Sequence, residues 1–350
     1  MTFDELIDYA ISREASDLHI TVGTACAIRR FGELEILPDI PTAEESQRMI
    51  LDSLNAEQTE KVLNGQDLDF ALFASNGFRL RANIYHQRNN IAASYRILNQ
   101  TIPSFEELEI PVAVQKLINE PRGLVLITGP TGSGKTTTMA SMIDYINRTK
   151  NLHVMTIEDP IEYVYYHQKS MIHQREVGKD VDTFAKAVRS ALREDPDIIM
   201  IGEMRDYETI SAAITAAETG HLVVSTLHTT SAAQTIERIL DAYPPHAQGQ
   251  ARAQLANVLR GVSTQILVPQ MNGEGMVLAT EVLLNNDAIA AQIRDNKTHQ
   301  IQSTIQSNMS SGMHTLETDL KRLMSAFRIS REDALAVANS PKELMMQNSF

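Results

Sequence analysis

The sequence predicts an α/β protein of two domains, and three observations support that fold class. The chain has 350 residues, which is enough for two hydrophobic cores. From residue 112 onward, short apolar runs alternate with helical patterns, as they do in a parallel sheet with crossover helices. One of these runs, residues 123–128, leads directly into a glycine-rich turn and a helix. The N-terminal part predicts a small α+β domain instead.

Composition and charge predict a soluble protein of the cytoplasm. Hydrophobic residues make up 43% and charged residues 21% of the chain, and no stretch approaches the roughly 20 apolar residues that span a bilayer. The N-terminus shows no secretory signal, and the single cysteine, Cys26, predicts a buried thiol without a disulfide or a multi-cysteine zinc site. The formal net charge of −13 argues against a nucleic-acid partner.

Helices and a strand are predicted near the N-terminus. Thr2 can open a capping box before a helix over residues 3–11, whose apolar side chains fall on one face. Residues 18–22 alternate between apolar and polar, as a strand would. A second capping box at Thr42 predicts another helical segment, for which Gly65 is the stop signal.

A β-hairpin and a third strand follow. Apolar and polar residues alternate on both sides of Asn76-Gly77, a pair typical of tight hairpin turns, and residues 91–98 predict the third strand. The alternation places Arg81 on the face opposite the apolar side chains, and the third strand carries Arg96. A charge on an exposed strand face is usually only solvated, so the strand pattern alone favours a structural role for both arginines.

The domain boundaries follow from these patterns. Residues 1–99 form the first predicted domain, residues 100–111 with their prolines and glutamates form a linker, and residues 112–350 form the second domain. An antiparallel hairpin is predicted within residues 265–283, and the chain after Asn286 is predicted to be helical. The apolar runs that predict the parallel strands are residues 123–128, 153–157, 198–201 and 222–226.

The glycine-rich turn fits the phosphate-binding loop pattern G-x-x-x-x-G-K-[ST] at every fixed position. A strand, a glycine turn and the start of a helix place backbone N–H groups and the positive helix end around a phosphate. The alternative interpretation is a glycine-rich turn without a ligand, and the flanking strand and helix argue against it. Lys135 can then reach the β- and γ-phosphates of ATP, and the Thr136 hydroxyl can hold Mg²⁺. The predicted nucleotide-binding residues are Gly129, Pro130, Thr131, Gly132, Ser133, Gly134, Lys135 and Thr136.

Carboxylates follow two of the predicted strands. Residues 198–201 lead to Gly202 and Glu203, a Walker B arrangement with glutamate in place of the usual aspartate; a carboxylate at a helix N-terminus is the alternative. Glu158 and Asp159 end another strand and must face opposite ways. We favour Glu158 as the group that orients and deprotonates the attacking water, although spacing alone leaves this choice nearly even.

Two histidines, His221 and His228, bracket the last predicted parallel strand. A metal site is disfavoured, because no cysteine or third close histidine completes a tetrahedral set. A neutral imidazole can sense the γ-phosphate by hydrogen bonding, and a satisfied core histidine is an equally open interpretation.

Several stretches resemble motifs of the type II secretion and type IV pilus ATPases. Residues 192–206 resemble the family signature around Walker B, residues 156–163 its Asp box, residues 219–228 its His box, and residues 15–20 its N-terminal domain. Within that superfamily the chain is most similar to the PilT-type pilus retraction ATPases, over nearly its whole length.

The resemblance implies a PAS-like N-terminal domain, a RecA-like core with a helical C-terminal region, and a homohexameric ring that hydrolyses ATP with Mg²⁺ to drive pilus retraction and twitching motility. Nucleotide would lie between the two domains, with Arg81 and Arg96 completing the site, which reverses the interpretation from the strand pattern. Glu158 would be the catalytic carboxylate, and Glu203 would lie on the side of the metal ion. His221 and His228 would have a coupling role.

The resemblance also implies partners and a location: an inner-membrane platform protein of the pilus and a second retraction ATPase, at the cytoplasmic face of the inner membrane. Residues 288–295 depart from the retraction motif at the central positions Ala290, Ala291 and Gln292, so the direction of force stays open. Two alternatives stay open. One is an assembly (extension) ATPase, although proteins of that class resemble one another in a zinc-binding cysteine cluster that this chain lacks. The other is a nucleotide-gated assembly module without hydrolysis.

Overall fold

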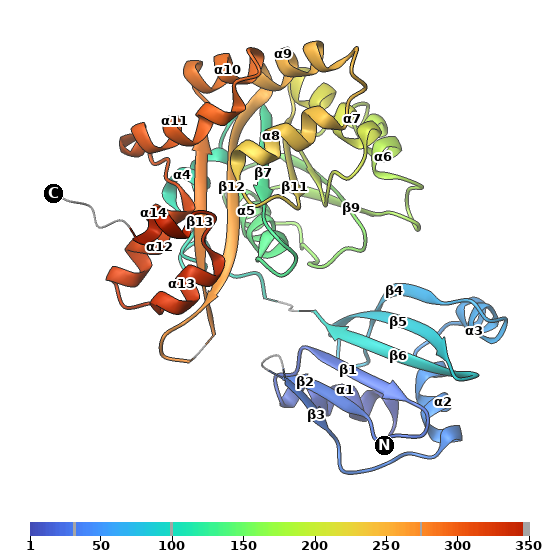
Figure 1. Ribbon diagram of the computed structural model, residues 1–350. Helices are drawn as coiled ribbons and strands as arrows, with labels where there is room; N and C mark the ends of the chain where they lie inside the picture. Colours follow the sequence, from blue (N-terminus) through green and yellow to red (C-terminus); the bar gives the residue numbers. More distant parts are fainter. Residues whose placement is uncertain (31–32, 99–100, 274, 346–350) are drawn as a thin grey trace. The chain divides into compact units, whose positions relative to one another are not determined.

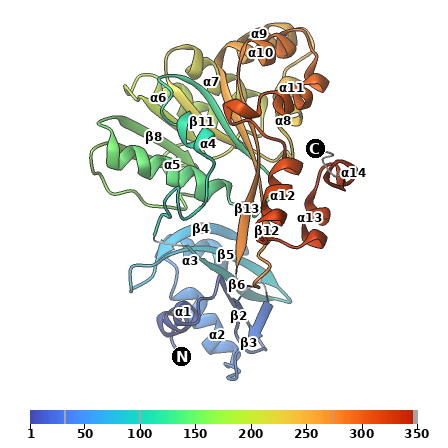
Figure 2. The ribbon, with the colours of Figure 1, turned by 90° about the vertical axis from the view of Figure 1, so that its left-hand side faces the viewer.

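The computed structural model describes residues 1–30, 33–98, 101–273 and 275–345. The chain divides into two compact units, and each has its own sheet and its own hydrophobic core (Figures 1 and 2). The predicted α/β fold class is confirmed. The predicted linker starts at residue 100, outside the described residues, and its part from Ile102 onward belongs to the second unit. The first unit comprises Met1–Thr101 with Pro160–Val164, and the second comprises Ile102–Asp159 with Tyr165–Phe350.

The first unit is built on an antiparallel sheet, called the N-terminal sheet below. Its strands are β1 (Asp17–Thr21), β2 (Ala27–Arg30), β3 (Glu33–Ile36), β4 (Leu68–Phe73), β5 (Arg79–Gln87) and β6 (Asn90–Ile97). Its helices are α1 (Phe3–Ser12), α2 (Ala43–Leu51) and α3 (Ala56–Leu63). The strand order is β3-β2-β1-β6-β5-β4, and apolar side chains of the helices and strands share one core.

Local sequence signals account for most of the first unit. Both predicted capping boxes form, at Thr2 and at Thr42. The segment up to Gly65 is two helices rather than one, because α3 begins anew with a capping box of Asn55 and Gln58. Strands β2 and β3 were not predicted, and the mostly exposed positions of β3 show why: its side chains carry no buried alternation.

The second unit is built on a mostly parallel sheet, called the core sheet below. Its strands are β7 (Gly123–Thr128), β8 (His153–Glu158), β9 (Met171–Glu176), β10 (Ile198–Ile201), β11 (Leu222–Leu227), β12 (Leu259–Pro269) and β13 (Met276–Leu284). The strand order is β13-β12-β7-β11-β10-β8-β9, and every pairing is parallel except that of β12 with β13. The predicted parallel strands and the antiparallel hairpin are confirmed.

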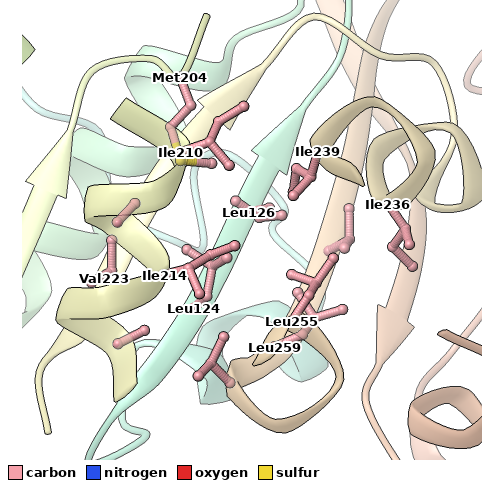
Figure 3. Packing of buried hydrophobic residues seen from close by; sticks show 14 of the residues in the cluster. Leu124, Leu126, Met204, Ile210, Ile214, Val223, Ile236, Ile239, Leu255 and Leu259 are labelled. Carbon is pink, nitrogen blue, oxygen red and sulfur yellow. The ribbon is translucent and has the colours of Figure 1, made fainter. Parts of the chain in front are cut away.

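Helices connect and cover these strands. They are α4 (Val112–Leu117), α5 (Lys135–Thr149), α6 (Phe184–Ala191), α7 (Tyr207–Glu218), α8 (Ala232–Asp241) and α9 (Gln248–Val258). Figure 3 shows Leu124 and Leu126 of β7 among Ile210 and Ile214 of α7 and Ile236 of α8, all fully or almost fully buried. Burial of each such side chain contributes about 1.5–3 kcal/mol to the stability of the fold. The core therefore fixes β7 and the turn that follows it.

The chain after Asn286 is helical as predicted, within the described residues. These helices are α10 (Asp287–Arg294), α11 (Ile301–Ser307), α12 (Leu316–Ser325), α13 (Arg331–Val337) and α14 (Pro341–Met345), with short 3₁₀ turns at Thr298–Gln300 and Met309–Ser311. The stretch that departs from the retraction motif lies in α10, where Ala290 is buried and Gln292 Nε2 donates to Thr304 Oγ1 at 2.8 Å. In the described part of the chain, no helix has the length and apolar content needed to cross a bilayer.

Candidate active site

The phosphate-binding loop forms the turn between β7 and α5. Gly129, Gly132 and Gly134 have φ angles of +144°, +79° and +85°, a region that glycine enters without steric cost. A Cβ atom on Gly129 would lie 2.2 Å from the carbonyl oxygen of Gln265, so a larger residue cannot take its place. The backbone geometry of the loop therefore requires the glycines that the pattern contains.

The loop presents groups that suit an anion. Gly134 is the N-cap residue of α5 and offers no side-chain cap, so the first-turn N–H groups of the helix face outward with the positive end of its dipole. The hydroxyl of Ser133 is buried and has no hydrogen-bond partner among the described residues. Lys135 Nζ donates to the carbonyl oxygens of Gly129 and Pro130, at 2.8 Å each. These features fit the phosphates of a nucleotide.

Strand β12 braces both ends of this loop. Thr128 and Thr264 share a buried hydrogen bond of 2.9 Å between their hydroxyls at the start of the loop. Gln265 Nε2 donates to Thr138 Oγ1 at 3.0 Å in the first turn of α5. Sequence reasoning missed these partners, because they lie more than a hundred residues away and only the folded chain brings them together: Thr264 pairs with Thr128 in the sheet register, and Gln265 follows it.

The carboxyl ends of β7, β11, β10 and β8 lie side by side in the core sheet. The register pairs Thr128 with Leu227, and the Gly202 N–H donates to the Ile157 carbonyl at 2.8 Å. The side chains that end or follow these strands therefore gather at one edge, called the carboxyl edge below, as ligand-binding groups of α/β sheets do. The predicted site residues at this edge are Gly129 with the rest of its loop, His228, Glu203 and Glu158.

Glu203 lies two residues beyond the end of β10. Its carboxylate is 2.7 Å from Arg205 and 3.6 Å from His228 Nε2, and its side chain is only 16% exposed. The alternative role, that of a carboxylate at a helix N-terminus, belongs to Asp206, which caps α7 by accepting from the Thr209 N–H. Glu203 therefore follows β10 at the carboxyl edge, and the cap of α7 is Asp206.

Glu158 is the last residue of β8 and is 5% exposed. Its Oε1 accepts a hydrogen bond from Thr156 Oγ1 at 2.6 Å and another from Gln174 Nε2 at 3.2 Å. Strand β9, which supplies Gln174, was not predicted, because its alternation is interrupted by polar residues. A mostly buried carboxylate held by donors is suited to a fixed role as general base.

Arg81 and Arg96 lie directly opposite each other on β5 and β6, in the first unit. Arg81 donates to both carboxylate oxygens of Asp69, at 3.1 and 2.8 Å, and Arg96 Nε donates to Asp17 at 3.0 Å. The Arg81–Asp69 pair is partly exposed, and such a pair contributes about 0–1 kcal/mol to stability. Asp17 is buried, so the Arg96–Asp17 pair is not a simple surface pair. The acidic partners were not predicted, since the strand register sets these pairings.

His221 does not join the carboxyl edge. It precedes β11, so it lies at the amino edge of the core sheet, the edge where the parallel strands begin. Its Nδ1 is 3.0 Å from the carbonyl oxygen of Ala216, at the end of α7. The structure therefore brings His228 to Glu203 and separates His221 from both by the length of β11.

A cavity of about 190 Å³ lies beside the start of α5. Leu267 and Leu278 give it an apolar wall, and Arg328 at its rim forms a bidentate ion pair with Glu109, at 2.7 and 3.2 Å. These residues come from distant segments, so no sequence pattern could group them. The residues around the cavity are Glu107, Leu108, Glu109, Gly134, Thr137, Thr138, Leu267, Gln270, Met276, Val277, Leu278 and Arg328.

The described residues contain two candidate groups for a metal ion bound together with nucleotide phosphates. Among the described residues, no cluster of three or more histidine, cysteine, aspartate or glutamate side chains could hold a metal ion. Mg²⁺ is usually bound by one or two protein groups together with substrate phosphates and water. Thr136, at the start of α5, and Glu203, at the carboxyl edge, fit that pattern.

Comparisons with known proteins agree with this geometry. The model of a family described as Type II/IV secretion system protein matches residues 1–317. The chain is 43% identical to the type IV pilus retraction ATPase PilT of Pseudomonas aeruginosa, over 98% of this chain and 99% of that protein. It is 44% identical to a twitching motility protein of Neisseria gonorrhoeae, over 88% of this chain and 82% of that protein. A crystal structure of the pilus retraction motor PilT with bound ADP superimposes with a TM-score of 0.91 at 45% identity, over 98% and 99% of the two chains.

Proposed function

The chain belongs to the type II/IV secretion system protein family, and from this premise we propose that it is an ATPase motor that powers type IV pilus retraction and twitching motility. The names of its relatives describe these activities, and the similarity extends over most of each chain. The observation that carries the proposal is the gathering of the phosphate-binding loop, Glu158 and Glu203 at one edge of the core sheet.

Each group at the carboxyl edge has a role in phosphoryl transfer. Lys135 exchanges its two backbone carbonyl partners for the β- and γ-phosphates of ATP. Glu158 orients the attacking water and takes its proton. Thr136 and Glu203 hold Mg²⁺, which when bound neutralises charge on the phosphates. His228, at 3.6 Å from Glu203, couples the state of the nucleotide to the chain beyond β11.

The remaining parts of the proposal extend beyond the carboxyl edge. The cavity beside Gly134, Thr137 and Thr138, which has an apolar wall of Leu267 and Leu278, takes the adenine base, because the phosphates occupy the loop that these residues continue. Arg81 and Arg96 of the first, PAS-like unit exchange their acidic partners for nucleotide phosphate and complete the site. A coupling role of His221 would be exerted from the amino edge.

We further propose the assembly in which the motor works. The RecA-like second unit and the PAS-like first unit repeat in a homohexameric ring at the cytoplasmic face of the inner membrane. The ring contacts the pilus platform protein and works with a second retraction ATPase. The net charge of −13 supports a protein partner rather than nucleic acid.

Deletion of the gene tests the direction of force. If the chain drives retraction, the deleted strain carries excess surface pili and does not move by twitching. A strain without surface pili would instead identify an assembly ATPase. Phosphate release by the purified chain separates both motors from an assembly module that binds nucleotide without hydrolysis.

A further inference from the structure

Gln174 of β9 lies beside the proposed general base. In the parallel register Gln174 is directly opposite Thr156 of β8, and Glu158 follows Thr156 by two residues. Because side chains alternate along a strand, Thr156, Glu158 and Gln174 share one face of the core sheet. Thr156 is fully buried and Glu158 is 5% exposed, so hydrogen bonds within this group face little competition from water.

The two donors on this face converge on one oxygen. Thr156 Oγ1 donates to Glu158 Oε1 at 2.6 Å, and Gln174 Nε2 donates to the same oxygen at 3.2 Å. Hydrogen bonds to a charged group are about twice as strong as neutral ones. A pair that meets at one carboxylate oxygen also fixes how the carboxylate is turned about its last torsion, which is otherwise soft.

The other end of the Gln174 amide determines its own orientation. The backbone N–H of Tyr165 donates to Gln174 Oε1 at 2.9 Å. A backbone N–H can only donate, so the amide oxygen must face Tyr165 and the NH₂ group must face the Glu158 carboxylate. The same amide therefore joins the two residues that flank the segment 159–164: Glu158, which ends β8, and Tyr165, which precedes β9.

We propose that Gln174 is a positioning residue for ATP hydrolysis, which holds the Glu158 carboxylate in the orientation that accepts a proton from the attacking water. In that step a water O–H bond breaks and its proton passes to Glu158. The water oxygen bonds to the γ-phosphorus, and the bond from that phosphorus to the bridging oxygen breaks as ADP leaves. The inference rests on the proposed role of Glu158 as the base.

Gln174→Met in the full chain tests the inference, because it keeps the length of the side chain and removes the hydrogen bonds to Glu158 and Tyr165. We expect kcat to fall about 10- to 100-fold, the range that misplacing a catalytic group costs, with KM for ATP and nucleotide affinity little changed. Gln254→Met is the matched control, since Gln254 also donates its amide to a carboxylate, that of Glu218, at 2.7 Å. That control should keep wild-type kcat.

The decisive comparison repeats the substitution in a Glu158→Gln background. A residue that acts through Glu158 leaves the residual turnover of Glu158→Gln unchanged, whereas a general structural role lowers it further by a similar factor. If Gln174→Met does not fold, as judged by its thermal unfolding, Gln174→Asn replaces it with a side chain too short to reach both partners.

Wild-type kcat in the Gln174 variant, or an equal loss in both backgrounds, would overturn the inference. Failure of the proposed function looks different, because the unmodified chain would then release no phosphate from ATP. Failure of the role of Glu158 would leave Glu158→Gln at the wild-type rate.

Discussion

The two edges of the core sheet carry similar residues and differ in what those residues contact. At the amino edge, His153 and His221 lie with Nδ1 3.0 Å from the backbone carbonyls of Asp195 and Ala216. At the carboxyl edge, His228 faces Glu203 and the phosphate-binding loop follows β7. The chain direction of a parallel strand therefore decides which of two similar side chains lies where a nucleotide can bind.

The largest expected effect is at Lys135. Lys135→Ala should abolish ATP turnover and weaken nucleotide binding, because it removes the charge that faces the β- and γ-phosphates. Lys150→Ala is the matched control, since Lys150 lies at the opposite end of the same helix, α5. Phosphate release by the purified variants measures the contrast. Equal turnover of the two variants would show that a lysine in the phosphate-binding loop matters no more than one at the far end of α5.

Within the carboxyl edge, the two carboxylates should differ. Glu158→Gln should keep nucleotide binding and lower hydrolysis by about 10²–10⁴, the usual contribution of a general base. Glu203→Gln should instead shift the Mg²⁺ concentration needed for half-maximal turnover. Titration of Mg²⁺ with both variants measures this, and identical curves would show that the division of roles is wrong.

Substitution of His228 and of His221 compares one histidine at the carboxyl edge with one at the amino edge. His228→Ala should lower turnover, because the imidazole is 3.6 Å from Glu203, and the loss should be smaller than that of Glu203→Gln. His221→Ala should lower turnover less than His228→Ala, since His221 bonds to the backbone at the other edge. Turnover of both variants at saturating ATP decides the order. A reversed order would mean that distance from Glu203 does not govern their effect.

The smallest effect on turnover is expected at Glu281 of β13. Burial, together with the nearby Glu317 carboxylate, raises the pKa of Glu281 to about 7, although the Ala232 N–H donates to it at 2.7 Å. The folded chain therefore holds this proton more tightly than the unfolded chain, so the stability it contributes is present below pH 4.5 and is lost as pH rises through 7.

At about 1.4 kcal/mol per pKa unit, that loss amounts to about 3 kcal/mol. Glu281→Gln, which keeps an acceptor for the Ala232 N–H, should flatten this part of the pH dependence and leave turnover unchanged. Urea unfolding at pH 5 and pH 8 measures it. An equal change in the free energy of unfolding between pH 5 and pH 8 for wild type and variant would contradict the raised pKa of Glu281.

Consecutive residues carried most of what the sequence predicted correctly. The phosphate-binding loop, the capping boxes at Thr2 and Thr42 and the Asn76-Gly77 hairpin depend on neighbours within a few positions. Strand β9 was missed because a parallel edge strand with polar residues lacks the apolar run of a buried one.

Contacts between distant segments could not be predicted. Arg96 meets Asp17 across 79 residues through strand register, and Gln265 meets Thr138 across 127 residues because helix α5 packs beside β12. The same reason hid Gln174 from a sequence-based search for site residues. The bracketing of β11 by His221 and His228, in contrast, could be read from consecutive residues.

If hydrolysis at the carboxyl edge powers retraction, blocking it in living cells must stop retraction. Labelled pili are followed on living cells whose copy of the gene carries Glu158→Gln. The account predicts that pili extend and accumulate but do not retract. Retraction at the wild-type speed in these cells would contradict it.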